Sequence, residues 1–442
     1  MATASAKQQA LVLGLGQTGR SVCRYLLAAG YQVHAMDSRA RLPNPQQLPA
    51  GIQVTVGGFD ADAVTAADLV VLSPGISRSE PVLAALSEGA ELVGDVELFA
   101  RVCQAPVLAV TGTNGKTTVT TLTGQILADA GLRIEVGGNI GTPVLDLLAR
   151  PVPDYYVLEI SSFQLETTHS LRPHAAALLN LTPDHLDRHG DLAHYAAAKL
   201  RLLQACAHRV LPRQDALVQQ YFTVQAWRSI GTGPAVSQRE YGLVAGDQDF
   251  ALCHGDKVLA NCREFALKGR HNLLNIQAAL ALAESVGVNN HQALAVIRKF
   301  TGLPHRTEPL GLHAGVHWIN DSKGTNVGAT VAALQALDGP CILLAGGQGK
   351  GQNFAPLAAV AAQAVRLAIV FGQDREQLAD VLRSQVSVRE VKTLEQAVTL
   401  AEGSAVAGDC VLLSPACASF DQFSSYQERG NRFRQLVREL RP

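Results

Sequence analysis

Apolar residues along the chain fall into short runs that alternate with longer segments in which apolar positions recur at helical spacing. Runs of mostly apolar residues occur at 9–13, 69–72, 106–110 and 341–344. Such runs are typical of strands buried on both faces of a parallel sheet. Further strands of this kind are predicted at 31–36, 155–160, 175–179, 317–319, 367–371 and 410–413. The alternation with helices, one of which begins at Lys116, predicts an α/β fold.

The same alternation repeats in three sections, whose joints are marked by glycine and proline. The chain has 442 residues, which at roughly 150 residues per domain suggests about three domains. One joint is predicted at Gly94–Asp95 and the other near Gly302–Leu303–Pro304. We therefore predict domains at 1–94, 95–302 and 303–442.

Composition narrows the class of protein without identifying its chemistry. Hydrophobic residues make up 47% of the chain and charged residues 17%, which is typical of a globular protein rather than a disordered one. Lys and Arg together number 37 and Asp and Glu 38, so the net charge is −1. This balance argues against a protein that binds nucleic acid or anionic membranes through a basic excess. It leaves room for a local basic site that binds a small phosphorylated ligand.

We expect neither a membrane anchor nor a secretory leader. The longest apolar stretch, 357–371, is shorter than the roughly 18 residues of a spanning helix and contains Gln363 and Arg366. The eight cysteines form no C-x-x-C pair, so we expect buried thiols in a reducing compartment rather than zinc ligands. The expectation is therefore a cytoplasmic monomer that does not insert into membranes.

A first glycine-rich turn follows the first predicted strand. Gly14, Gly16 and Gly19 fit G-x-G-x-x-G, and Asp37 ends the next strand about twenty residues later, as in the dinucleotide fingerprint. In this context backbone amides and a helix N-terminus bind a pyrophosphate. Gly75, after another apolar strand, lies in a turn that could line the same crevice. A tight turn without a ligand and a nicotinamide-dependent dehydrogenase are the alternatives.

A second glycine-rich turn, 111–118, follows a strand and opens a helix, as a P-loop does. It provides amides for phosphate groups, Lys116 for the outer phosphate oxygens and the Thr117 hydroxyl for Mg²⁺. Val110 stands where the generic motif has its first glycine. Glu159 ends a buried strand, where a carboxylate either binds a nucleotide-bound Mg²⁺ or is a solvated strand end. Two phosphate sites in successive domains favour ATP in one and a substrate with its own pyrophosphate in the other.

Further polar clusters follow predicted strands, where side chains face the crevice of a parallel sheet. The segment 184–189 is compatible with a metal site or with a solvated turn. Lys199 taken alone would be a surface lysine of a helix, and the polar residues at 271–275 would cap a helix. The segments 320–326 and 414–419 follow strands in the same manner.

These motifs together resemble the Mur ligases, and the P-loop without its first glycine is that family's own form. The segments that carry the resemblance lie at 111–117, 179–182, 184–187, 302–306 and 320–326. Further matching segments follow the same order along the chain, at 14–19, 73–76, 94–99, 137–141, 158–166 and 413–423. This second set resembles the members of the family that add D-glutamate.

The resemblance implies an ATP-dependent amide ligase of peptidoglycan precursor synthesis. Its substrates would be UDP-N-acetylmuramoyl-L-alanine and D-glutamate, and its cofactors ATP and two Mg²⁺ ions. The fold would comprise an N-terminal Rossmann-like domain, a central P-loop mononucleotide-binding domain and a C-terminal Rossmann-like domain. Phosphoryl transfer from ATP to the alanine carboxylate would give an acyl phosphate, which the amine of D-glutamate attacks. Another Mur-type ligase with a different amino acid, a dehydrogenase and a nucleotide sensor remain as alternatives.

The resemblance also implies which residues contact each ligand. The UDP-linked substrate would contact Gly16, Thr18, Asp37, Ser38, Arg39 and Gly75 in the first domain, and Asn139 and Ser161 in the second. ATP would contact Gly112, Asn114, Gly115, Lys116, Thr117, Thr118, Asn272, Asn275, Arg306, Asp321 and Lys350. D-Glutamate would contact Lys323, Thr325, Ser414, Ser419, Phe420 and Tyr426.

Metal binding and catalysis are implied for five residues. Thr117 and Glu159 would hold one Mg²⁺, and His185 and Lys199 the second. The resemblance implies that Lys199 carries a carbamate and therefore acts as an acidic ligand rather than as a cation. Lys116 would stabilise the charge that develops during phosphoryl transfer. His185 is the candidate base for the incoming amine.

Overall fold

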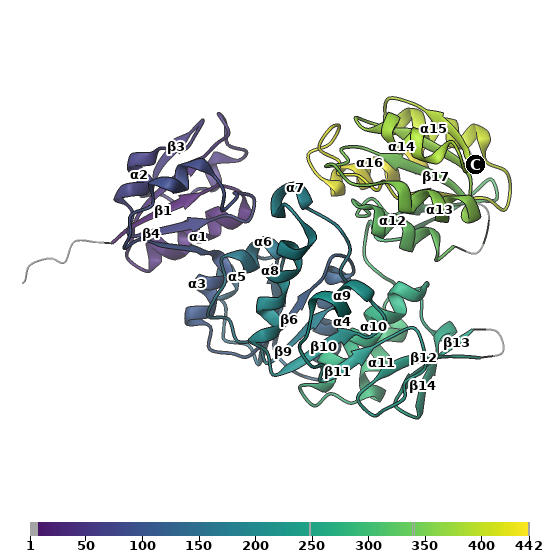
Figure 1. Ribbon diagram of the computed structural model, residues 1–442, viewed down its shortest axis with the longest axis horizontal. Coiled ribbons are helices and arrows are strands. Elements are labelled where there is room, and N and C mark those ends of the chain that lie inside the picture. The colour runs from purple at the N-terminus through teal and green to yellow at the C-terminus, as the bar shows by residue number, and fades with distance from the viewer. Residues whose placement is uncertain (1–7, 247–248, 338, 340, 441–442) are drawn as a thin grey trace, which may run out of the picture.

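The computed structural model describes residues 8–246, 249–337, 339 and 341–440, which form three lobes in chain order (Figure 1). The first lobe contains a parallel sheet of strand order β3-β2-β1-β4-β5. Its strands are β1 (Gln9–Leu13), β2 (Gln32–Asp37), β3 (Gln53–Val56), β4 (Leu69–Leu72) and β5 (Glu91–Gly94). Its helices are α1 (Gln17–Ala28), α2 (Ala61–Ala66), η1 (Pro45–Gln47) and η2 (Pro81–Ala85). The strand order reverses between β1 and β4, which is where an open α/β sheet forms its ligand crevice.

The second lobe is built on a parallel sheet of order β11-β10-β9-β6-β8-β7. Its strands are β6 (Val107–Thr111), β7 (Ile134–Gly138), β8 (Tyr155–Glu159), β9 (Ala175–Leu178), β10 (His208–Pro212) and β11 (Arg228–Ile230). Its helices are α3 (Asp95–Val102), α4 (Lys116–Asp129), α5 (Val144–Leu147), α6 (Ser162–Glu166), α7 (Leu186–His189), α8 (Leu192–Gln204), α9 (Ala216–Tyr221), α10 (Arg270–Glu284) and α11 (Asn290–Lys299). The central strand β6 is buried along its whole length, as its uninterrupted apolar run predicts.

An antiparallel sheet of β12 (Tyr241–Ala245), β13 (Phe250–His254) and β14 (Lys257–Asn261) is attached to the second lobe. The sequence pattern did not predict this sheet. Its strands are only partly buried, and Val244 and Val258 are exposed, so the segment lacks the long apolar runs that mark the parallel strands. A short helical turn, η3 (Cys262–Glu264), follows it.

The third lobe contains a sheet of order β15-β16-β20-β17-β18-β19. Strand β15 (Glu308–His313) pairs antiparallel with β16 (Val316–Asn320). The other strands, which pair in parallel, are β17 (Cys341–Gly346), β18 (Val365–Phe371), β19 (Ser387–Glu390) and β20 (Cys410–Leu413). The helices are α12 (Val327–Leu334), α13 (Ala355–Ala364), α14 (Arg375–Leu382), α15 (Leu394–Ser404) and α16 (Tyr426–Arg438).

The architecture confirms the predicted α/β fold, with a parallel sheet in each of the first two lobes and a sheet that is parallel except for β15 in the third. The predicted joint at Gly94–Asp95 lies where β5 passes directly into α3, and the joint at 302–304 lies between α11 and β15. The apolar stretch 357–371 is divided between α13 and β18. Across the described residues, no helix is both long and apolar enough to cross a membrane. Residues that follow β1, β4, β7 and β16 line one shared cavity, so the sheets point their carboxyl ends toward a common site.

Candidate functional site

The turn between β6 and α4 forms a cradle of backbone amides with a lysine across it. Gly112 has a φ of 143° and Gly115 a φ of 87°, which residues with a side chain rarely adopt. A Cβ atom on Gly115 would lie 2.3 Å from Oδ1 of Asn275. Nζ of Lys116 donates hydrogen bonds to the carbonyl oxygens of Gly112 at 2.9 Å and Thr113 at 2.7 Å. Burial lowers the pKa of Lys116, and an anion at the helix N-terminus would stabilise the charged form.

Glu159 lies at the end of β8, beside this cradle. Its carboxylate is 2% exposed, and Oε2 accepts a hydrogen bond of 2.7 Å from the Thr117 hydroxyl. Nδ2 of Asn139 donates to Oε1 at 2.7 Å, and the guanidinium of Arg306 contacts the Thr117 hydroxyl. Because Glu159 is buried, the alternative of a solvated strand end is wrong. A hydroxyl and a carboxylate side by side next to a phosphate cradle fit the oxygen ligands that Mg²⁺ prefers.

Lys199 lies inside the protein, so its interpretation as an ordinary surface lysine is wrong. The residue is 1% exposed, on α8, and Nζ donates to the carbonyl oxygen of Gly112 at 2.9 Å. The same nitrogen lies 4.4 Å from the centre of the Tyr195 ring. Burial, together with the nearby charge of Lys116, lowers the pKa of Lys199 well below its ordinary value. Two lysines therefore converge on one carbonyl of the P-loop, and Lys199 is the deeper of the two.

His185 occupies the turn before α7 in a left-handed backbone conformation, with φ 55°. Its Nε2 lies 3.6 Å from Oδ2 of Asp184, and its ring packs edge-on against Phe163 with centroids 4.8 Å apart. Burial lowers the pKa of His185 to about 4, despite the opposing effect of Asp184. A neutral imidazole keeps a lone pair that a metal ion can use. Among the described residues no three His, Cys, Asp or Glu side chains cluster tightly enough to hold a metal alone, so phosphate, water or a modified residue must complete any metal site here.

The second histidine of the 184–189 cluster has a structural role. Nδ1 of His189 lies 3.0 Å from Oε1 of Glu166, and Nε2 lies 3.0 Å from the Ser162 hydroxyl. Both ring nitrogens are thus engaged within the protein. Of the two histidines, only His185 fits a metal ligand.

A cavity of about 270 Å³ lies beside the P-loop, between α10 and the third lobe. Its lining includes the predicted ATP residues Asn114, Gly115, Thr118, Asn272, Asn275, Arg306 and Asp321, and also Lys323. Nδ2 of Asn275 donates to Oδ1 of Asn272 at 3.1 Å, so the two amides share one face of α10. Asp321 accepts a hydrogen bond of 2.7 Å from Ser414, and burial raises its pKa to about 6.

A larger cavity of about 870 Å³ connects all three lobes. Its lining includes Gly16, Thr18, Asp37, Ser38, Arg39, Gly75, Thr117, Asn139, Arg306, Lys323 and Tyr426. Nζ of Lys323 lies 4.2 Å from the centre of the Tyr426 ring, and burial together with the charge of Arg306 lowers its pKa to about 7. The structure therefore brings residues predicted for two different substrates into one continuous space beside the P-loop.

The carboxylate of Asp37 is hydrogen-bonded to neighbouring groups of the first lobe. Oδ2 accepts a hydrogen bond of 2.7 Å from the Leu15 amide, and both carboxylate oxygens bind the guanidinium of Arg39, at 2.8 and 2.7 Å. Although burial opposes ionisation, Arg39 and these amide donors lower the pKa of Asp37 to about 2. Asp37 and Arg39 both line the 870 Å³ cavity, where a ligand of the first lobe would meet them.

The remaining predicted residues lie around these cavities. Lys350 lines a neighbouring space of about 1,020 Å³ together with His185 and Gly75. The hydroxyl of Ser161 caps α6 by accepting the Gln164 amide at 3.2 Å. In the third lobe the predicted D-glutamate residues differ in exposure: Ser414 and Ser419 are buried, Thr325 is partly buried, and Phe420 is 67% exposed.

Sequence reasoning missed Arg429, a fully buried arginine of α16. Its guanidinium donates to the backbone carbonyl of Ser322 at 2.8 Å and to that of Cys417 at 3.1 Å. It also donates to the Ser322 hydroxyl at 3.0 Å. Arg429 thereby ties the loop before α12 to the loop after β20. No motif marked it, because an arginine in a polar helix is normally solvated.

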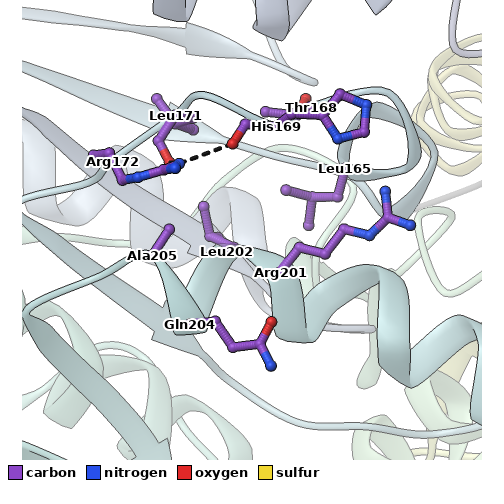
Figure 2. A pocket seen from close by; sticks show the side chains of 9 residues that line it. All are labelled: Leu165, Thr168, His169, Leu171, Arg172, Arg201, Leu202, Gln204 and Ala205. Carbon is purple, nitrogen blue, oxygen red and sulfur yellow. Dashed lines mark hydrogen bonds between the residues drawn. The ribbon is translucent and has the colours of Figure 1, made fainter.

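A cavity of about 430 Å³ lies away from this site and contains none of the predicted site residues (Figure 2). Its apolar floor is formed by Leu165, Leu171 and Leu202, and Arg172 and Arg201 lie at its rim. Arg172 donates to the carbonyl oxygen of His169 at 2.8 Å and Arg201 to that of Glu166 at 3.0 Å. Both guanidinium groups are therefore already held by backbone carbonyls.

The fold and the site define a phosphate-binding α/β enzyme in which a P-loop faces a second nucleotide crevice. Three family models match the chain: the Mur ligase MurD-like N-terminal domain at 8–94, the Mur ligase middle domain at 110–283, and the Mur ligase glutamate ligase domain at 305–417. The chain belongs to the Mur ligase family. This confirms the resemblance inferred from the motifs.

Comparison with individual proteins shows which members of the family the chain is similar to. The UDP-N-acetylmuramoylalanine–D-glutamate ligase of Nitrosococcus oceani is 46% identical over 441 residues, which cover 97% of this chain and 96% of the relative. The enzyme of the same name from Escherichia coli (strain UTI89 / UPEC) is 46% identical over 436 residues, covering 97% and 98%. Among solved structures, UDP-N-acetylmuramate-alanine ligase MurC from Thermotoga maritima has a TM-score of 0.63 at 19% identity, covering 98% of this chain and 99% of that one. At that identity it supports the fold alone.

Proposed function

We propose that this protein is the ATP-dependent ligase that joins D-glutamate to UDP-N-acetylmuramoyl-L-alanine, a step of peptidoglycan precursor synthesis in the cytoplasm. The observation that carries the proposal is the 870 Å³ cavity, because it joins the first-lobe glycine turn to Arg306 and Lys323 beside the P-loop. A substrate with a diphosphate at one end and a carboxylate at the other would span this space. Relatives of that name, 42–46% identical over nearly the whole chain, support the choice of substrates.

The reaction requires activation, because a carboxylate is a poor electrophile. Transfer of the γ-phosphoryl group of ATP to the alanine carboxylate gives an acyl phosphate and ADP. The uncharged amine of D-glutamate then attacks the carbonyl carbon, and phosphate leaves from the tetrahedral intermediate as the amide forms. Lys116 would hold the outer phosphate oxygens, and Arg306, next to Thr117, would stabilise the charge that develops during transfer.

Two pairs of residues would hold divalent cations. Thr117 and Glu159, which share a hydrogen bond, would hold one Mg²⁺, and His185 with a modified Lys199 would hold the other. When bound, Mg²⁺ neutralises phosphate charge and aligns the reacting oxygens. A carbamate on Lys199 forms when the uncharged amine adds to CO₂ and releases a proton. Lys199 is buried against the P-loop carbonyl, and a carbamate there would add an anionic ligand, since the described residues offer no cluster of three metal-binding side chains.

His185 is the candidate general base for the incoming amine, and it is also a candidate metal ligand. These two roles compete for the lone pair of one imidazole nitrogen. Its pKa of about 4 makes it a weak proton acceptor at neutral pH. The low pKa therefore favours His185 as a metal ligand over a general base.

The deciding assay supplies ATP, Mg²⁺ and UDP-N-acetylmuramoyl-L-alanine with a panel of amino acids and measures ADP release. We expect release chiefly with D-glutamate. Equal or greater turnover with L-alanine or a diamino acid would identify another Mur-type ligase instead. Lys116→Ala should abolish turnover, whereas Lys257→Ala, which alters an exposed lysine of β14, should leave it unchanged. Tight binding of NAD without binding of ATP would refute the ligase assignment.

A further inference from the structure

Asn326 lies at the place where the third lobe meets the P-loop. It ends the loop between β16 and α12 and is 3% exposed. Its Oδ1 accepts a hydrogen bond of 2.8 Å from the Ala329 amide, so it caps the N-terminus of α12. A cap of this kind is a common structural role for asparagine.

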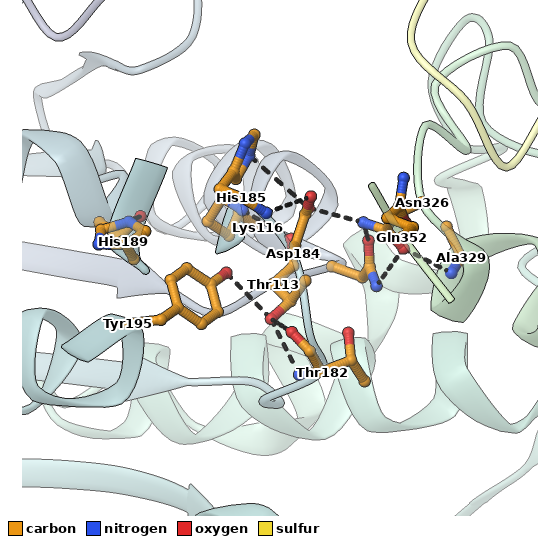
Figure 3. A network of polar contacts seen from close by, with 12 residues as sticks. Thr113, Lys116, Thr182, Asp184, His185, His189, Tyr195, Asn326, Ala329 and Gln352 are labelled. Atoms are coloured by element: carbon orange, nitrogen blue, oxygen red, sulfur yellow. Dashed lines mark hydrogen bonds and ion pairs between the residues drawn. The ribbon is translucent and has the colours of Figure 1, made fainter. Parts of the chain in front are cut away.

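The amide nitrogen of Asn326 makes two further contacts, both to the second lobe (Figure 3). Nδ2 donates to Oδ1 of Asn114 in the P-loop at 3.1 Å and to Oδ2 of Asp184 at 2.9 Å. Nδ2 of Asn114 returns a hydrogen bond of 3.3 Å to Oδ1 of Asn326. One buried side chain therefore bonds its own helix, the P-loop and the turn that carries His185.

Both partners are fixed within the second lobe. The backbone amide of Asn114 donates to Oδ1 of Asn180 at 2.8 Å, and Nδ2 of Asn180 donates back to the Asn114 carbonyl at 3.0 Å. Asp184 accepts the backbone amide of His185 at 2.9 Å. A displacement of α12 would consequently break or strain its contacts to the P-loop and to the turn before α7.

We propose that Asn326 is a positioning residue that couples the placement of the third lobe to the P-loop. This inference rests on the proposed ligase function, because that reaction needs groups from both lobes in register. Asparagine suits the position because its short amide supplies two donor hydrogens and an acceptor at once. Serine also caps a helix, but its shorter side chain lacks the amide that reaches Asn114 and Asp184.

The test separates coupling from capping by means of Asn326→Ser, which keeps a capping hydroxyl. The matched control is Asn289→Ser, because Asn289 caps α11 in the same way, by accepting the Gln292 amide at 3.0 Å. We expect Asn326→Ser to lower kcat about tenfold or more, the effect of losing roughly one to two net hydrogen bonds. Asn326→Ser should lower the thermal midpoint more than Asn289→Ser does, because it also loses the buried hydrogen bonds to Asn114 and Asp184, but it should remain folded at the assay temperature. The kcat of Asn289→Ser should equal that of the wild type.

A double-mutant cycle with Asn114→Ala measures the coupling itself. Because Asn326 acts partly through Asn114, the double variant should lose less kcat than the product of the two single losses. Independent roles would make the losses multiply and would overturn the proposal, as would an Asn326→Ser enzyme with wild-type kcat. Should the serine variant fail to fold, Asn326→Asp keeps the shape and the cap but removes both donors and faces Asp184 with a second charge. A folded aspartate variant with full kcat would equally refute the coupling.

A measurement without turnover distinguishes failure of this inference from failure of the proposed function. Small-angle scattering with a non-hydrolysable ATP analogue and Mg²⁺ should show a larger radius of gyration for Asn326→Ser than for the wild type and for Asn289→Ser. If the serine variant shows this larger radius of gyration but the wild type proves to have no ligase activity, the coupling is retained and the proposed function is refuted. If the wild type is an active ligase but the serine variant has the same radius of gyration, the coupling is refuted and the proposed function is retained.

Discussion

Asp95, the first residue of α3, is a buried carboxylate whose ionisation should weaken the fold. It is 2% exposed, and Nε2 of Gln164 donates to its Oδ2 at 3.1 Å. Burial, which outweighs the favourable Gln164 contact, raises its pKa from 3.8 to about 6. The folded protein therefore binds this proton more tightly than the unfolded chain does. The contribution is most favourable below pH 4, declines as the pH rises toward 6, and is constant above that.

The size of the effect follows from the displacement of the pKa. Each pKa unit corresponds to about 1.4 kcal/mol, so the ionised carboxylate lowers the free energy of unfolding by about 3 kcal/mol at pH 8. Asp95→Asn removes the charge and keeps an oxygen that Gln164 can bond. The new amide nitrogen must find an acceptor, which costs about 1–2 kcal/mol where none is available. We expect a net stabilisation of about 1–2 kcal/mol at pH 8 and none at pH 4.

Urea denaturation at pH 4, 6 and 8 measures this difference directly. The control is Asp62→Asn, which alters an exposed aspartate of α2 and should give no stabilisation at pH 8. Asp95→Asn should be more stable than the wild type only at the higher pH values. A variant that is destabilised equally at all three pH values would show that Asp95 is held by its hydrogen bonds and not opposed by desolvation, and would refute the reasoning.

Two further predictions concern Lys199 and Glu97. Lys199→Ala should lose ligase activity and regain part of it with a short carboxylate such as acetate, because the carboxylate replaces the proposed carbamate; full activity without acetate would remove Lys199 from the site. Glu97 accepts the amides of His169 at 2.7 Å and Ser170 at 2.9 Å, and these donors, together with Arg101, outweigh burial and lower its pKa to about 2. Its stabilisation should be present above about pH 4.5 and decline as the pH falls toward 2. Glu97→Gln should cost about 1–3 kcal/mol at pH 7 in urea denaturation, and an unchanged midpoint would contradict this.

The parallel sheets could be predicted from the sequence because strands buried on both faces need apolar residues at every position. Strands β1, β4, β6 and β17 show this plainly. The antiparallel sheet β12–β14 escaped prediction, because its strands are half-buried and their patterns are short. One local signal was available: Gly255 and Asp256 separate β13 from β14 as a two-residue hairpin turn, and Gly255 has a positive φ of 57°.

The site residues fall into two groups, those whose chemistry a local motif carries and those whose partners lie far away in the sequence. The P-loop and Glu159 could be predicted because a short segment or a strand end carries their chemistry by itself. Lys199 could be predicted only through the family resemblance, and Asn326 was not assigned a role at all, because each has partners that only the folded chain supplies. Asn326 contacts Asn114, 212 residues away, and Asp184, 142 residues away. Lys199 is buried against a carbonyl 87 residues earlier, and this burial lowers its pKa well below the ordinary value, which favours the uncharged amine that the proposed carbamate needs. Motifs therefore predict the groups that would bind phosphate, whereas the contacts of Lys199 and Asn326 follow from packing within and between the lobes.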